Sequence, residues 1–204
     1  MSVTGFWIVA AVPSPAVSQL RAGIPGEPQE PEDLSWWQAM DSAALAEPES
    51  RGLGGAAPLM RYSASARCPA PGARRPDFDV DASMDLLTHI PAQDRFVASI
   101  RKGDPVAALY YGLGFEAALA MPGRSGCFLL TAEEVPDTAR ATDTILATDP
   151  VRRASVAARI NAWLQVTGDA SNDVDVEGLI DGPGQILSRA NQSAQGALGI
   201  VQWY

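Results

Sequence analysis

The chain has 204 residues, 47% of them apolar, so it is long enough to enclose a hydrophobic core and too apolar to be disordered throughout. Its formal net charge of −9 argues against nucleic-acid binding, because an acidic surface repels the phosphate backbone. The basic pairs Arg74-Arg75, Arg101-Lys102 and Arg152-Arg153 are too short to form a basic stripe. One lysine against 14 arginines indicates a GC-rich, bacterial source.

The location of the protein is predicted from segments that the sequence lacks. No apolar stretch approaches the roughly 18–20 residues of a transmembrane helix. The apolar run near the N-terminus has no preceding basic residue, which a signal peptide would require. We therefore expect a cytoplasmic protein that does not bind a membrane. Cys68 and Cys127 are far apart and outside any CxxC pattern, so we expect free thiols, with a single disulfide as the alternative.

Two strand-like segments lie at opposite ends of the chain. Residues 2–12 and 197–204 are apolar and rich in valine, isoleucine and aromatic residues, which favour strands. We predict that both belong to one sheet, within a single domain that covers residues 1–204. Because helical patterns dominate between them, the predicted fold class is α+β, with a helix-rich domain around a small mixed or antiparallel sheet.

The first part of the chain combines two predicted helices with an irregular segment. A short helix is expected at 16–21, with Ser14 as its N-cap and Pro15 as its first helical residue, because serine followed by proline is a common helix start. A second helix is expected at 34–46. The segment 47–77 is rich in proline and glycine and shows little periodicity, so we predict irregular structure there, with a short strand at 58–62.

The second part of the chain is more regular. The predicted helices are 81–88, 92–102, 105–111, 115–121, 132–147, 151–166 and 185–195, with a short buried strand at 126–130. Thr131 and Glu134 form a capping box, in which each side chain binds the backbone N–H of the other residue. Gly196 is expected to end the last helix in the left-handed conformation.

The adjacent tryptophans Trp36 and Trp37 are the first candidate site. Neighbouring residues on a helix point about 100° apart, so one buried face cannot hold both rings. An exposed tryptophan beside Glu30, Glu32 and Asp33 is typical of a protein-binding patch, since tryptophan is enriched in binding hot spots. The alternative, that both indoles pack beneath the long irregular segment, is equally open.

A ligand pocket around His89 is the second candidate site. His89 is the only histidine, and Asp85, Tyr110 and Tyr111 are the polar residues that could join it. A zinc site would need both cysteines and a carboxylate from distant segments, so we predict no metal site. No spacing supports a nucleophile, a phosphate-binding loop or a dinucleotide motif, so we assign no catalytic residue and expect no cofactor.

Three patches of the chain resemble the YfbM-like family of uncharacterised bacterial proteins. They are the opening strand and capped helix at 1–20, the strand and acidic helix start at 126–135, and the closing helix and strand at 187–204. The resemblance implies a small α+β fold and no established activity. The family usually carries a tryptophan-containing helix with a nearby histidine, whereas here the segment 34–40 has tryptophan without histidine.

These observations favour a non-enzymatic cytoplasmic protein that binds another protein, of the immunity type that neutralises a toxin. The acidic surface supports this prediction, because it would steer the chain toward a basic partner. An enzyme or small-ligand-binding protein with a pocket near His89 is the second hypothesis. A structural or assembly component, such as a phage or particle protein, is the third. The oligomeric state is not predicted.

Overall fold

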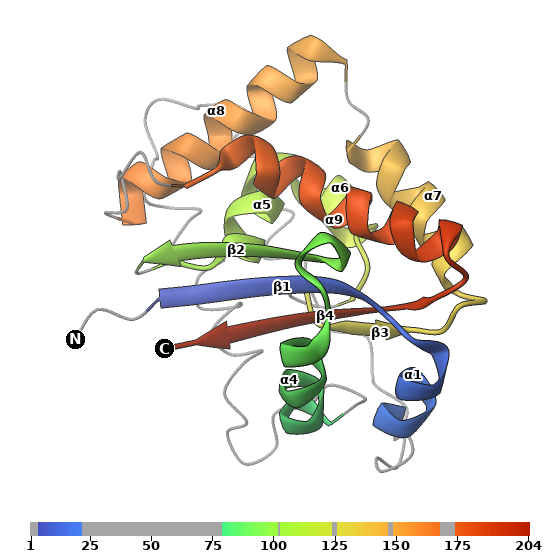
Figure 1. Ribbon diagram of the computed structural model, residues 1–204. Coiled ribbons are helices and arrows are strands. Elements are labelled where there is room, and N and C mark those ends of the chain that lie inside the picture. Colours follow the sequence, from blue (N-terminus) through green and yellow to red (C-terminus); the bar gives the residue numbers. More distant parts are fainter. Residues whose placement is uncertain (1–3, 22–78, 102, 124–125, 147–148, 168–173) are drawn as a thin grey trace, which may run out of the picture.

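The N- and C-terminal strands pair with each other at the centre of an antiparallel sheet (Figure 1). The computed structural model describes residues 4–21, 79–101, 103–123, 126–146, 149–167 and 174–204. In this part of the chain the strand order is β2-β1-β4-β3. The strands are β1 (Thr4–Val12), β2 (Arg95–Arg101), β3 (Phe128–Leu130) and β4 (Gly196–Trp203). The predicted α+β fold, with both terminal strands in one sheet, is confirmed.

Helices cover both faces of this sheet (Figure 1). On one face lie α5 (Pro105–Leu113), α6 (Phe115–Leu119), α7 (Val135–Leu146), α8 (Pro150–Thr167) and α9 (Val176–Gln192). On the other lie α1 (Ser14–Arg21) and α4 (Val80–His89), and a short 3-10 turn (Ala92–Asp94) precedes β2. No helix among the described residues is long and apolar enough to cross a membrane.

Alternation along β1 divides the core into two clusters. Trp7 and Val9 belong to the larger cluster, beneath α5–α9, whereas Ala10 and Val12 belong to the smaller cluster with α1 and α4. Successive strand residues point to opposite faces, so a strand that is apolar throughout can supply both clusters at once. This explains why β1 has no polar face in the sequence.

Aspartates hold the starts of several helices. The Asp79 carboxylate accepts from Ala82 N–H at 3.0 Å, Asp104 from Val106 N–H at 3.0 Å, and Asp175 from Gly178 N–H at 2.8 Å. Asp149 accepts from Val151 N–H at 2.9 Å and from Arg152 N–H at 3.1 Å. An N-cap satisfies amides that have no partner within the helix, and the helix dipole favours its negative charge. Four of the chain's aspartates therefore stabilise the starts of helices.

The predicted capping box at the start of α7 is confirmed and has a third member. Thr131 N–H donates to Glu134 Oε2 at 2.7 Å, and Glu134 N–H donates to Thr131 Oγ1 at 3.3 Å. Arg21, at the end of α1, donates to the same Glu134 oxygen at 2.8 Å and to the Leu129 carbonyl at 2.7 Å. Partial burial raises the pKa of Glu134, but the Thr131 amide and Arg21 lower it more, so the net pKa lies below its usual value.

The helix predicted at 92–102 was wrong, because most of that segment is the strand β2. Phe96, Ala98 and Ile100 face the larger cluster, whereas Val97 and Ser99 are exposed. The alternation has a period of two, which is the strand signal. Pairing with β1 decides the outcome.

The last helix was predicted too short, since α9 begins at Val176 and contains Pro183. Proline lacks an N–H and normally breaks a helix. Here Gly182 relieves the crowding before proline, and both residues are buried where α9 packs on β1 and β2. A Cβ at position 182 would overlap the Phe96 ring. Packing against the sheet therefore outweighs local propensity.

Candidate functional site

The protein-binding patch predicted from the sequence lies outside the described residues. This applies to Trp36, Trp37, Glu30, Glu32 and Asp33 together. It applies equally to the irregular segment 47–77, including the strand expected at 58–62, and to Cys68. The structure places none of these residues, so their role stays a prediction.

The four residues of the predicted ligand pocket do not converge. His89 and Asp85 are exposed on α4, on one face of the sheet. Tyr110 is buried in α5 on the opposite face, and the Tyr111 ring packs against Trp163 of α8 with centroids 5.5 Å apart and planes tilted by 43°. The sheet lies between the two pairs (Figure 1). Spacing along the chain could not show this, because β2 separates α4 from α5.

A groove between α7, α8 and α9 is the candidate site that the described structure offers instead. It has a volume of about 690 Å³ and is widely open to solvent. Its lining residues are Asp143 and Leu146 from α7, Arg153 from α8, and Asp181, Gly184, Gln185, Ser188, Arg189 and Gln192 from α9. The α9 residues are three, four and seven positions apart, so they form one stripe on that helix.

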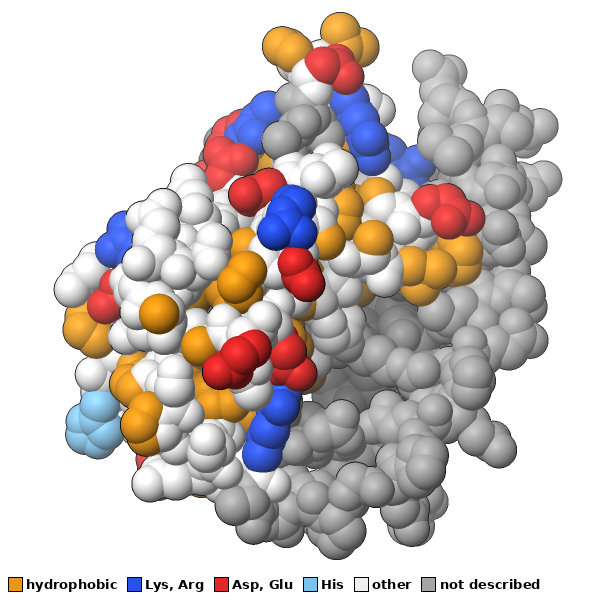
Figure 2. Space-filling view, turned by 90° about the vertical axis from the view of Figure 1, so that its right-hand side faces the viewer, with side chains coloured by type: hydrophobic (Ala, Val, Ile, Leu, Met, Phe, Trp, Pro, Cys, Tyr) orange, Lys and Arg blue, Asp and Glu red, His pale blue; other side chains and the backbone are white. Residues whose placement is uncertain are grey.

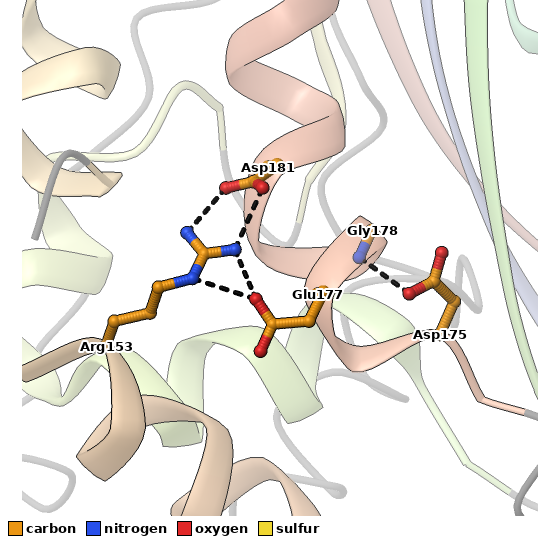
Figure 3. A network of polar contacts seen from close by, with 5 residues as sticks. All are labelled: Arg153, Asp175, Glu177, Gly178 and Asp181. Atoms are coloured by element: carbon orange, nitrogen blue, oxygen red, sulfur yellow. Dashed lines mark hydrogen bonds and ion pairs between the residues drawn. The ribbon is translucent and has the colours of Figure 1, made fainter. Parts of the chain in front are cut away.

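One wall of the groove is fixed by an arginine that bridges two helices (Figure 3). Arg153 Nη1 and Nη2 donate to the two Asp181 oxygens at 2.7 and 2.8 Å. Its Nε and Nη2 donate to Glu177 Oε2, with Nε at 2.8 Å. Glu177 and Asp181 are four residues apart and so share a face of α9. The bonds to Asp181 and then to Glu177 raise the pKa of Arg153 further above its usual value.

Acidic and basic side chains on the lining of the groove are equal in number, with Asp143 and Asp181 against Arg153 and Arg189. Arg153 is paired with Glu177 and Asp181, and Arg189 lies 3.5 Å from Asp94. Asp143 has no ion-pair partner within the described part of the chain. Glu177 and Asp94 pair with the two arginines from outside the lining, so Asp143 is the lining carboxylate that stays outside these ion pairs. The side of the molecule that carries α7 shows acidic and basic side chains mixed with apolar ones (Figure 2).

The sequence contained one signal for this groove that the helix prediction missed. With α9 expected to start at Gln185, Asp181 and Gly184 lay outside the helix, and the polar stripe was too short to recognise. Asp143 and Arg153 come from other helices, so only the tertiary packing of α7 and α8 brings them to this stripe. The periodicity within one helix does not show which other helices pack against it.

Neither a metal site nor a relative defines the function. Among the described residues, no group of three or more histidine, cysteine, aspartate or glutamate side chains could hold a metal ion. Comparison of the chain with protein-family models, with curated proteins and with solved structures gave no match.

Proposed function

We propose that this chain is a non-enzymatic protein that binds a basic partner protein through the groove between α7, α8 and α9, and that it is of the immunity type that neutralises a toxin. One observation carries the proposal. An open groove is lined by helices from three parts of the chain, and the Asp143 carboxylate on its lining has no ion-pair partner among the described residues.

The charge of the whole chain supports the same kind of partner. A formal charge of −9 attracts a basic protein over distances of about a Debye length, which is roughly 8 Å at physiological salt. Charge complementarity mainly raises the rate of association and the specificity. An inhibitor that must reach its toxin quickly benefits from both.

Affinity capture with two matched charge reversals tests this function. The bait is the full chain, used as wild type, as Asp143→Lys in the groove and as Asp85→Lys on α4. Both aspartates are exposed on helices, but they lie on different faces of the molecule. We expect a basic partner from the native host to bind the wild type and Asp85→Lys, and to be lost from Asp143→Lys. The complex should also weaken as salt is raised.

The immunity role has its own readout. The captured partner, expressed alone, should arrest growth, and co-expression of this chain should restore it. Co-expression of Asp143→Lys should restore growth less well. A partner that binds the Asp143→Lys variant as strongly as the wild type would contradict the role of the groove, and a harmless partner would contradict the immunity role.

A further inference from the structure

We propose that residues 34–46 of this chain dock on the sheet, on an apolar surface that α1 and α4 leave open, with Trp37 against it. We call it the open sheet surface, and it consists of Phe6, Ile8, Val97 and Tyr204. Three observations carry the inference: the exposure of these side chains, the place where residues 22–78 leave and rejoin the described part of the chain, and the apolar pattern of 34–46. The open sheet surface lies on the opposite side of the sheet from the groove, so the inference is independent of the proposed function.

The open sheet surface continues an apolar face of the sheet that is buried at its other end. The end of β1 next to α1 belongs to the smaller core cluster, whereas Phe6 and Ile8 nearer its start are only half-buried. Val97 of β2 pairs with Ile8 and is 51% exposed. Tyr204 is 72% exposed, and its ring lies edge-on to Phe6 with centroids 5.6 Å apart. Because paired residues on neighbouring strands point to the same side of a sheet, these side chains form one surface, which is typical of a place where another element packs.

The chain itself brings residues 22–78 to this face. Asp79 N–H donates to the Leu20 carbonyl at 3.4 Å, so the segment starts and ends at one place, between α1 and α4. Both helices lie on the same side of the sheet as the open sheet surface (Figure 1). When extended, residues 22–33 span up to about 40 Å, whereas β1 is about 30 Å long. Residues 34–46 can therefore reach every part of this face.

The sequence of residues 34–46 supplies the side chains that such a surface requires. Leu34, Trp37, Ala44 and Leu45 recur at helical spacing and form one apolar side of the helix predicted there. Tryptophan offers a large apolar area, and aromatic rings pack favourably edge-to-face, which suits the two aromatic rings of the open sheet surface. Docking would remove apolar area from water on both the segment and the sheet.

A segment of the same chain is favoured over a second copy of the chain. A tethered segment has an effective concentration of about the millimolar range, which exceeds the concentration of a separate molecule in dilute solution. Two copies that each carry a net charge of −9 also repel each other. The occupant of the open sheet surface is therefore the chain's own segment.

Nuclear Overhauser contacts in the full chain test the docking. They are recorded from the Trp37 indole to the labelled methyl groups of Ile8 and Val97. We expect contacts from Trp37 and none from Trp36, which points about 100° away on the predicted helix. A mixture of labelled and unlabelled chains isolates contacts between two copies, and we expect none there. Contacts between copies only, contacts from Trp36 only, or no contact with the open sheet surface would each overturn the inference.

Limited proteolysis with trypsin gives a second readout. Docking should protect the peptide bond after Arg51, because cleavage follows the population of the undocked form. Val97→Asp and Tyr204→Asp should each raise the rate of cleavage there by about fivefold or more. Val151→Asp is the matched control on α8, where Val151 is 80% exposed on the other side of the sheet, and its rate should equal that of the wild type.

A third variant separates docking from a loss of folding. Trp37→Ala should raise the cleavage rate by the same factor, and its combination with Val97→Asp should raise the rate no further, because both changes remove one contact. Circular dichroism reports whether each variant is folded, and Tyr204→Asp serves if Val97→Asp is not. Wild-type cleavage in the folded variants, or an equal increase in Val151→Asp, would overturn the inference. Capture of a partner by the groove is measured separately with Asp143→Lys, so either proposal can fail without the other.

Discussion

Ala194 ends α9 in a conformation that normally belongs to glycine. Its φ is 49°, and it is the only non-glycine residue with positive φ in the described structure. Gln195 N–H donates to the Ala190 carbonyl at 2.9 Å, and Ala194 N–H donates to the Asn191 carbonyl at 3.2 Å. These are the two bonds of a Schellman motif with Ala194 at its left-handed position. The left-handed position predicted from the sequence was Gly196, which instead begins β4.

Ala194→Gly should therefore stabilise the protein. The left-handed conformation costs a residue with a Cβ about 1–2 kcal/mol, and the greater freedom of glycine in the unfolded chain offsets part of the gain. We expect the free energy of unfolding to rise by about 0.5–1 kcal/mol, measured by urea denaturation. Ala141→Gly is the matched control on the exposed face of α7, where the same change should cost about 1 kcal/mol. A fall in stability for both variants would contradict the strain at Ala194.

At the scale of the element, the start of α7 should depend on pH through Glu134. Its pKa is lower in the folded state, so the stabilisation is present above the unfolded pKa, near 4.5, and is lost as the pH falls through the folded pKa. Because the side chain is 48% exposed, we expect Glu134→Gln to cost only about 0.5 kcal/mol at pH 7. The stabilities of the wild type and the variant should converge as the pH falls below 4.5.

Unfolding by urea at pH 7, 5, 4 and 3 measures this difference. Glutamine keeps an oxygen that accepts from the Thr131 amide, so the variant removes the charge that Arg21 contacts and retains the cap. A gap in stability that stayed constant down to pH 3 would assign the effect to hydrogen-bond geometry and contradict the role of charge.

The elements that the sequence predicted correctly are those whose signals are local. The proline-led helix starts at α1, α5 and α8 and the box at Thr131 require only a few neighbouring residues, and all are found. The errors at β2 and in α9 have another origin. Pairing with β1 makes a strand of a segment with charged ends, and packing on Phe96 preserves a helix through Pro183. The groove could not be predicted from local signals, because it forms where three helices pack together.

At the scale of the whole molecule, the two ends of the described chain meet inside the sheet. Thr4 N–H donates to the Tyr204 carbonyl at 2.7 Å, and Tyr204 N–H donates to the Thr4 carbonyl at 3.0 Å. Since β1 pairs with both β2 and β4, and β3 pairs with β4, neither central strand can be lost without dividing the sheet. Folding therefore requires contacts between the most distant parts of the sequence, which slows it relative to a fold of local contacts.

This arrangement predicts that a circularly permuted chain folds when its new ends lie between α7 and α8, and does not fold when they lie within β4. Two glycines between Tyr204 and Met1 would connect neighbouring ends of an antiparallel ladder, so the link should introduce little strain. New ends between Ala147 and Thr148, after α7 and before α8, should give a cooperative thermal transition within about 5 °C of the linear chain. New ends between Gly199 and Ile200 divide β4 opposite Val9 and Ile8, and should abolish that transition. If both permutants unfolded cooperatively at the same temperature, the central strand would not hold the two halves of the sheet together, and the role assigned to β4 would be wrong.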